Sequence, residues 1–159
     1  MSNSLDKVNL PDYNGTGRTF VEDTRALFIT NRDELTKACN EMAMPWKPVF
    51  CQGGYFLMVD ITACKDLIPE KFMQTHDYEV EDGRPLVNKN RINMPDGSVP
   101  MDLAFCRWMA VEKGVAFMPN SFFYAKDSPT ITDKYVRLAI CKDRQSTEAA
   151  TERLRNALN

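Results

Sequence analysis

Residues 134–143 read KYVRLAICKD and alternate in the manner of a β-strand. Val136, Leu138 and Ile140 recur at every second position, so one side of the strand is expected to face an apolar core. The other side is mixed and carries Arg137. A guanidinium in this setting is either solvated or reserved for an anion, because an unpaired buried charge is costly. The pattern alone leaves both roles open and favours the solvated one.

Helical patterns occur before and after this strand. Apolar residues recur at near-helical spacing over residues 19–44, and Thr19 with Glu22 forms a capping-box pattern. Asn31 offers a second helix start, so the segment is either one helix or two. A second helix is expected over residues 101–113, ended by Gly114 at the position after its C-cap. Ser146, Thr147 and Glu148 predict the start of a last helix.

Strands are expected over residues 50–61 and 115–124, in addition to the segment quoted above. Pro119 cannot donate to a β-ladder, so the second of these should end or lie at a sheet edge there. We therefore predict an α+β domain of two layers, in which about three mainly antiparallel strands pack against helices. The helices are expected over residues 19–44, 101–113 and 147–158.

Composition narrows the class of protein. The chain has 159 residues and a net charge of −2, which suits one domain and gives no concentrated basic surface for nucleic acid. No run is long and apolar enough to span a membrane. We expect no targeting peptide and a cytoplasmic location by default, with a mitochondrial one left open. Five scattered cysteines and one histidine have no zinc-ligand spacing, so no metal site is predicted.

The residues contain no strong catalytic motif. His76 falls in a polar loop and is interpreted as solvated. The acidic residues Asp77, Glu79, Glu81 and Asp82 that follow it could bind a cation or form a solvated turn, and the pattern favours the turn.

Two aromatic groups beside small residues are stronger candidates for a ligand site. Tyr55 and Phe56 follow a glycine pair, and aromatic residues follow Ser121 as far as Tyr124. Such groups either line a ligand mouth or belong to an ordinary core, and the pattern favours the core.

Several segments together resemble a known family. They are KPVFCQGGYFLMVDIT (47–62), FCRWMAVEKGVAFMPNSFFY (105–124) and KYVRLAICKDRQSTEAATERLRNAL (134–158), preceded by the helical segment 19–44. In this order and spacing they resemble the C-terminal small domain of class I pyridoxal-phosphate aminotransferases. The likeness is greatest to the group of kynurenine aminotransferase, glutamine transaminase K and cysteine-conjugate β-lyase. It implies a small domain over 19–159 with an insertion at about 72–99. Residues 1–18 are polar and rich in turn residues, and we expect them to form an irregular N-terminal arm.

The resemblance also implies roles for particular residues. Arg137 matches the arginine that binds the substrate α-carboxylate, and its planar fork suits a bidentate contact. Tyr55 and Phe56 match a substrate-side strand, and Ser121 to Tyr124 match a loop that closes on the active site. No residue of the chain is assigned a catalytic role.

The family's chemistry belongs to pyridoxal phosphate, bound to a lysine of the large domain in a serine-rich context. Lys47 and Lys65 are not in such a context, so we expect this chain alone to bind no cofactor. Whether it is an enzyme stays open. The expected function is an aminotransferase small domain that is not catalytic alone and is completed by another protein chain. The alternative is a structural or interaction subunit of a larger assembly derived from an aminotransferase. Amino-acid or oxo-acid substrate is expected only where a partner completes the site.

Overall fold

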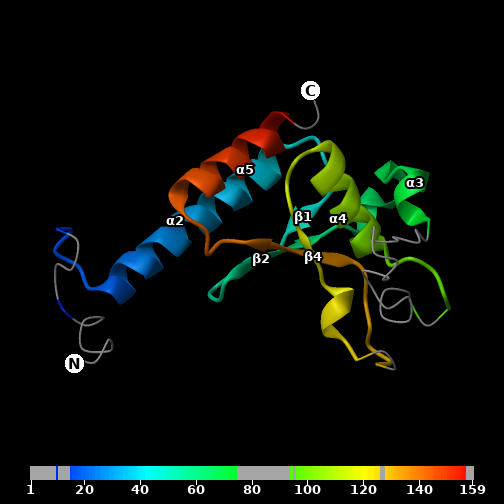
Figure 1. Cartoon of the computed structure of the whole chain (residues 1–159), viewed down its shortest axis with the longest axis horizontal. Helices are drawn as coiled ribbons and strands as arrows, with labels where there is room; N and C mark the ends of the chain where they lie inside the picture. The colour runs from blue at the N-terminus through cyan, green and yellow to red at the C-terminus, as the bar shows by residue number, and fades with distance from the viewer. Residues whose placement is uncertain (1–9, 11–14, 75–93, 95, 126–127, 157–159) are drawn as a thin grey trace, which may run out of the picture.

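The computed structural model describes residues 10, 15–74, 94, 96–125 and 128–156. Helices and strands are interspersed along the chain (Figure 1). In order they are α2 (Phe20–Glu41), β1 (Lys47–Pro48), β2 (Phe56–Asp60), the 3₁₀ helix η1 (Thr62–Leu67), α3 (Glu70–Met73), α4 (Met101–Glu112), β3 (Met118–Pro119), the 3₁₀ helix η3 (Ser121–Phe123), β4 (Tyr135–Ala139) and α5 (Arg144–Asn156).

The strands form one antiparallel sheet in the order β1-β2-β4-β3. This confirms the predicted α+β domain, with one strand more than the three expected. Both outer strands are only two residues long, and each contains a proline, Pro48 or Pro119. Because proline has no N–H to donate, it is tolerated at sheet edges and limits how far pairing extends. The strand expected over 115–124 is shortened to 118–119 and ends at Pro119, and the inner strand expected over 50–61 spans 56–60.

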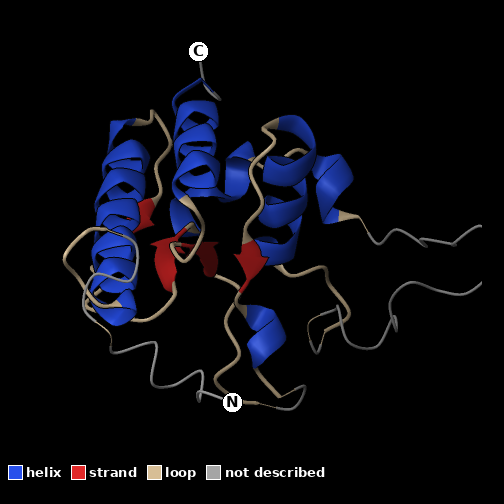
Figure 2. Cartoon of the chain, turned by 60° about the vertical axis from the view of Figure 1, so that its left-hand side comes forward, coloured by secondary structure: helices blue, strands red, loops and turns tan. Residues whose placement is uncertain are grey.

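The two faces of the sheet differ in burial. Leu57 and Val59 of β2, with Val136 and Leu138 of β4, are buried. The alternate positions of both strands are only half-buried. Figure 2 shows the main helices gathered on one side of the sheet. The other side carries Phe56, Met58, Asp60, Tyr135, Arg137 and Ala139, and we call these residues the open face.

The core lies between the sheet and the helices α2, α4 and α5. Leu35, Phe105 and Leu154 represent the three helices in it, each almost without exposed surface. The ring of Phe105 lies 6.0 Å from that of Trp46 and 5.9 Å from that of Trp108, centroid to centroid. Burial of aromatic and aliphatic side chains of this size supplies most of the driving force for folding.

The segment predicted as one helix or two is a single helix, α2. Its start is the predicted capping box: Thr19 Oγ1 accepts from the backbone N–H of Glu22, and the Glu22 carboxylate accepts from the N–H of Thr19. The second start proposed at Asn31 is wrong. Asn31 is fully buried inside α2, and its side-chain amide donates to the carbonyls of Ile140 and Lys142 at 2.9 and 2.8 Å. Its polar side chain joins distant segments and caps no helix.

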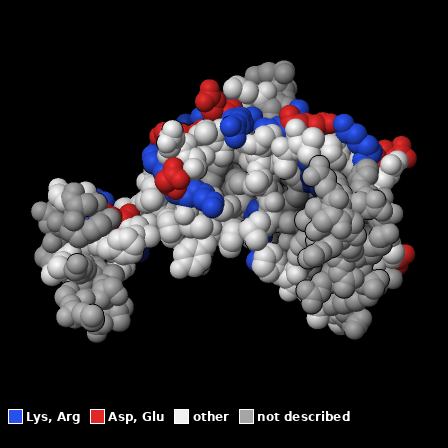
Figure 3. All heavy atoms as spheres, in the orientation of Figure 1, with Lys and Arg blue, Asp and Glu red and all other residues white. Residues whose placement is uncertain are grey.

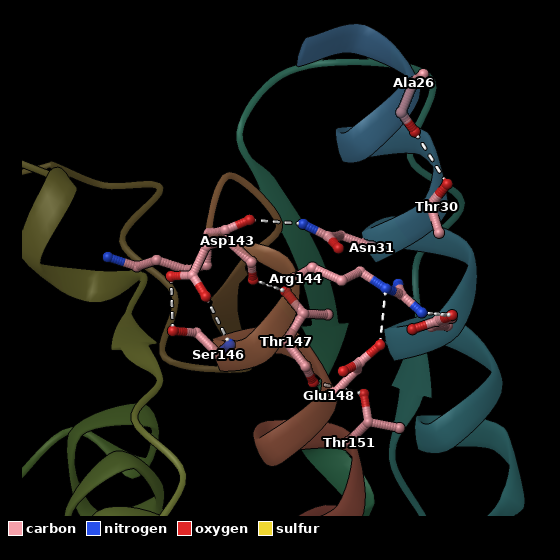
Figure 4. A network of polar contacts seen from close by, with 11 residues as sticks. Ala26, Thr30, Asn31, Asp143, Arg144, Ser146, Thr147, Glu148 and Thr151 are labelled. Carbon is pink, nitrogen blue, oxygen red and sulfur yellow. Dashed lines mark hydrogen bonds and ion pairs between the residues drawn. The ribbon is translucent and has the colours of Figure 1, made fainter. Parts of the chain in front are cut away.

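The last helix begins three residues before the predicted start at Thr147. The carboxylate of Asp143 accepts from the N–H and the hydroxyl of Ser146, each at 2.8 Å, as an N-cap residue does (Figure 4). These hydrogen bonds hold the pKa of Asp143 below its usual value. In Figure 1, α5 lies side by side with α2, and Arg144 of α5 forms ion pairs with Glu34 of α2 and with Glu148.

The second predicted helix is confirmed as α4, and Gly114 follows it with φ +67°, a value that favours glycine. In Figure 3 charged side chains of the described residues gather along the upper rim of the molecule. No helix in the described part of the chain is both long and apolar enough to cross a membrane. Most of the predicted arm (1–18) and insertion (72–99), including His76, lies outside the described residues.

Candidate functional site

Arg137 lies at the middle of β4, on the open face of the sheet. It pairs with Met58 of β2 on one side and Met118 of β3 on the other. Directly opposed residues of an antiparallel pair share a face, so two apolar methionines flank the guanidinium. Such flanks lower the local dielectric constant and strengthen any contact that Arg137 makes with an anion.

Two contacts hold the Arg137 side chain. Its Nε donates to Oδ1 of Asn120 at 3.0 Å, and its Cζ lies 3.8 Å from the centre of the Phe123 ring. Within the described ranges, Arg137 makes no further hydrogen bond or ion pair. The terminal nitrogens Nη1 and Nη2 are therefore available, and this pair of parallel donors matches the two oxygens of a carboxylate.

A buried carboxylate fixes the turn that supplies Asn120 and Phe123. Oδ2 of Asp102 accepts from the backbone N–H of Ser121 at 2.6 Å, and Oδ1 accepts from the Ser121 hydroxyl at 2.8 Å. Asp102 has no exposed surface, and Ser121 is also buried. Burial raises the pKa of Asp102, and the two hydrogen bonds from Ser121 partly oppose that rise. The start of α4 is thus tied to the short helix η3.

The other residues predicted for the site occupy different places. Phe56 lies opposite Ala139 on the open face, on the same side of the sheet as Arg137. Ser121 has its hydroxyl and N–H engaged by Asp102, and Tyr124 follows η3 and is half-buried.

Tyr55 is separated from this group. It is 62% exposed, and its ring lies edge-on to Phe28 of α2 at 5.8 Å. It lines a surface cavity of about 520 Å³ between α2 and the loop that precedes β2. Phe56 therefore shares the open face with Arg137, Ser121 and Tyr124 lie in or next to the turn that supplies Asn120 and Phe123, and Tyr55 lies beside α2.

Sequence reasoning missed Asn120, Phe123 as an arginine contact, and Asp102 as an anchor. The only signal for them was their position: Asn120 and Phe123 flank the predicted Ser121, and Asp102 opens a predicted helix. Periodicity describes one element at a time and does not reveal a contact between residues that are 17 apart. Among the described residues, no group of three or more His, Cys, Asp or Glu side chains is arranged to hold a metal ion.

Comparisons with known proteins agree on one family. No protein-family model matches the chain. Mouse kynurenine–oxoglutarate transaminase 1 is 27% identical over 125 residues, which is 78% of this chain and 24% of the relative. Methionine aminotransferase of Escherichia coli is 32% identical over 124 residues, which is 78% of this chain and 22% of the relative.

Solved structures give the same result. An Escherichia coli protein with a reported methionine aminotransferase function superposes with a TM-score of 0.51 at 30% identity. The match covers 82% of this chain and 24% of that protein. Bna3p of Saccharomyces cerevisiae superposes with a TM-score of 0.56 at 25% identity, over 87% of this chain and 27% of that protein. Fold, order of segments and sequence similarity agree: the chain is a class I pyridoxal-phosphate aminotransferase-like fragment, and it spans about a quarter of the length of the relatives it matches.

Proposed function

We propose that this chain supplies the carboxylate-binding part of an aminotransferase site, with Arg137 binding the α-carboxylate of an amino acid or 2-oxo acid. The observation that carries the proposal is that the Arg137 guanidinium is held in place while its terminal N–H groups remain available. It is held by Asn120 and Phe123, flanked by methionines, and keeps two parallel donors available on the open face. A solvated surface arginine would not need two such contacts. In this role Phe56 and Tyr124 would border the substrate, and Ser121 would hold the turn beside it.

Tyr55 fits this role less well, because its ring packs against Phe28 of α2. Substrates of the relatives suggest the class of amino acid. The relatives are named for kynurenine and methionine, and we propose an aromatic or glutamine-like amino acid for this chain. The apolar flanks of Arg137 suit a side chain that is largely apolar.

The described residues do not fit a complete cofactor site. Pyridoxal phosphate acts as an electron sink once a lysine holds it, and such a lysine works in a desolvated pocket. No described lysine is buried; Lys113 is half-buried at the end of α4, and the others are exposed. We therefore propose that this chain is not catalytic alone and that another protein chain, bearing the lysine, completes the site over the open face.

The direct test compares arginine variants in carboxylate binding. Calorimetry with 2-oxoglutarate and with kynurenine would be carried out on the full chain, alone and mixed with a lysine-bearing aminotransferase large domain. Loss of a charge-assisted hydrogen-bonded contact is worth about 1.5–3 kcal/mol, so Arg137→Ala is expected to weaken binding by roughly 10- to 100-fold.

Arg153→Ala is the matched control, because Arg153 is exposed on α5 and donates to the carbonyl of Gly114 at 3.0 Å, away from the open face. Equal binding by the wild type and Arg137→Ala would refute the proposed role of Arg137. Transamination by the isolated chain with added pyridoxal phosphate would refute the proposal that it is not catalytic alone.

A structural subunit is the second candidate function. The absence of a buried lysine among the described residues favours it, together with the apolar residues Phe56 and Met58 on the open face, which a partner would cover. In that case Arg137 would serve assembly and no small carboxylate would bind. Cross-linking in native extract followed by gel filtration separates the two. Loss of assembly in Arg137→Ala without any carboxylate binding by the wild type would identify the structural role.

A further inference from the structure

We propose that Asn120 and Phe123 are positioning residues that fix Arg137 with its Nη1–Nη2 edge outward, so that a carboxylate can dock only end-on. The inference rests on the proposed carboxylate role of Arg137 and adds the direction of approach. A guanidinium has two edges able to bind a carboxylate with parallel N–H donors. One edge joins Nε to a terminal nitrogen, and the other joins the two terminal nitrogens. Their availability differs in this structure.

Asn120 blocks the Nε edge. Its Oδ1 accepts from Nε at 3.0 Å, and Asn120 is 5% exposed, so no carboxylate oxygen can occupy the same position without displacing a buried side chain. Leaving a buried amide without its partner carries a desolvation cost. The edge between Nη1 and Nη2 has no such partner among the described residues. The carboxylate therefore meets the terminal edge.

Phe123 restricts the orientation of the guanidinium plane. Its ring lies 3.8 Å from Cζ, a stacking distance at which the plane is covered on that side. An arginine side chain loses considerable rotamer freedom when it binds a ligand, and a side chain already held in place loses less. Phe123 itself is 54% exposed, so its ring contributes to the position of Arg137 more than to the core.

The turn that carries both residues is anchored independently. Asp102, fully buried at the start of α4, accepts two hydrogen bonds from Ser121, which lies between Asn120 and Phe123 in the sequence. The position of the Arg137 side chain therefore depends on α4 as well as on β4, because α4 holds the η3 turn and the turn contacts the guanidinium. Asp102 therefore acts on Arg137 indirectly: it holds the Ser121 turn, and the turn holds the guanidinium through Asn120. The hydrogen bonds given for the described residues include none between Asp102 and Arg137.

NMR of the full chain labelled with ¹⁵N-arginine tests the arrangement without a ligand. In the wild type, the Nε–H signal of Arg137, assigned by its loss in Arg137→Lys, is expected to exchange slowly with water and to carry a ring-current shift. Phe123→Leu should remove the ring-current shift, and Phe123→Tyr should keep it. Asn120→Ala should accelerate exchange of Nε–H at least several-fold.

Phe122→Leu is the matched control, because Phe122 is the neighbouring residue of η3 and is 48% exposed. It should leave the Arg137 signal unchanged, and thermal unfolding should show that Phe123→Leu and Phe122→Leu are equally folded. The proposal is overturned if the Nε–H of Arg137 exchanges as fast as that of exposed Arg153. It is also overturned if neither Asn120→Ala nor Phe123→Leu changes the exchange rate or the chemical shift of this signal.

Titration with 2-oxoglutarate then tests the direction of approach. End-on docking moves the Nη signals while Nε–H stays protected, and Phe123→Leu weakens binding by about two- to tenfold through lost preorganisation. Displacement of the Nε–H bond by the ligand overturns the proposal. If the ligand-free signature is intact and 2-oxoglutarate moves no Arg137 signal, either alone or with the lysine-bearing large domain added, the proposed carboxylate function fails while the positioning of Arg137 by Asn120 and Phe123 stands.

Discussion

Asp102 is a carboxylate without exposed surface whose two oxygens serve a single residue, Ser121. Burial raises its pKa above the usual value of 3.8. The folded state therefore binds the Asp102 proton more tightly than the unfolded state does. Its ionisation lowers the free energy of unfolding as pH rises from the unfolded pKa through the folded one. The hydrogen bonds to Ser121 compensate for part of this cost.

Asp102→Asn should remove this pH dependence and keep the turn. The asparagine amide can accept from the Ser121 N–H and donate to its hydroxyl, so both contacts survive. We expect the free energy of unfolding of Asp102→Asn, relative to the wild type, to increase as pH rises above about 4, because only the wild type must ionise a buried carboxyl group. Urea denaturation at several pH values measures it. Asp143 and Asp96 have pKa values lowered by hydrogen bonds, and they also make stability depend on pH. Their contributions are the same in both proteins and cancel in the difference between the two free energies of unfolding. A difference that does not change with pH would contradict the assignment.

At this scale, alternation in the sequence indicated the face on which Arg137 lies but did not determine its role. The position was predictable because side chains alternate strictly along a strand. Its partners were not, because Asn120 and Phe123 reach it across a chain reversal whose geometry depends on Asp102. The roles carried over for Tyr55, Phe56, Ser121 and Tyr124 remain predictions.

The junction of α2, β4 and α5 depends on Asn31. Its buried amide donates to two carbonyls that follow β4, those of Ile140 and Lys142, and it thereby joins α2 to the segment that leads into α5. Figure 4 shows Asn31 of α2 pointing toward this segment beside Asp143. Buried carbonyls that lose their donor keep the full cost of desolvation. The Asn31 side chain is therefore expected to stabilise the fold, although it is a polar group in the core.

Asn31→Ala is expected to lower the free energy of unfolding by about 2–4 kcal/mol, because two hydrogen bonds are lost and their acceptors stay in place. Chemical denaturation followed by circular dichroism measures the change. Thr30→Ala is the control: Thr30 is the preceding residue in α2, exposed, and bonded only to the carbonyl of Ala26 one turn earlier among the described residues. It should change stability by less than about 0.5 kcal/mol. Equal effects of the two variants would show that Asn31 holds no junction.

Gly114→Ala tests the end of α4. Gly114 has φ +67°, where a side chain adds strain, while the space around it is open apart from Arg153 at ordinary contact distance. We expect a loss of about 1 kcal/mol, or roughly 2–4 °C in the melting temperature. Gly53→Ala, at a glycine without positive φ and with open space around it, should change the melting temperature little. If Gly114→Ala is as stable as Gly53→Ala, the positive φ at Gly114 does not require glycine.

The helices were more predictable than the strands, for physical reasons. A capping box at Thr19 and a glycine stop at Gly114 are local signals, and both are used as predicted. Strand length depends on pairing with neighbours: β3 ends at Pro119 on a sheet edge as predicted but begins only at Met118, and the edge strand β1 at Pro48 was not predicted. The start of α5 was misplaced because Asp143 and Ser146 are both good caps, and only the structure shows which one accepts the hydrogen bonds.

The molecule as a whole has helices on one side of its sheet and the open face on the other (Figure 2). Met118 is 40% exposed beside Arg137, and Phe56 and Met58 are half-buried on the same side. Apolar surface of this kind is usually covered in a working assembly. The proposed lysine-bearing partner would cover this apolar surface. The same contact would complete the site around Arg137.

Met118→Lys should therefore separate assembly from folding. The side chain is on an edge strand and partly exposed, so we expect an unchanged fold and a change in stability below about 1 kcal/mol. A charge placed at the contact with the partner should reduce complex formation at least tenfold in gel filtration or light scattering. Val111→Lys is the control, because Val111 is 74% exposed on α4. Loss of the complex in both variants, or in neither, would mean that the partner does not sit on the open face.

The two prolines at the sheet edges also bear on how the chain avoids aggregation. Strand-by-strand growth, as in amyloid, requires an outer strand with a regular row of free N–H and C=O groups. Here both outer strands have two residues, and one of each pair, Pro48 or Pro119, has no N–H. Another copy finds almost no template for backbone pairing at either edge. The sheet is thus limited to its own four strands, even while its open face stays accessible to a partner.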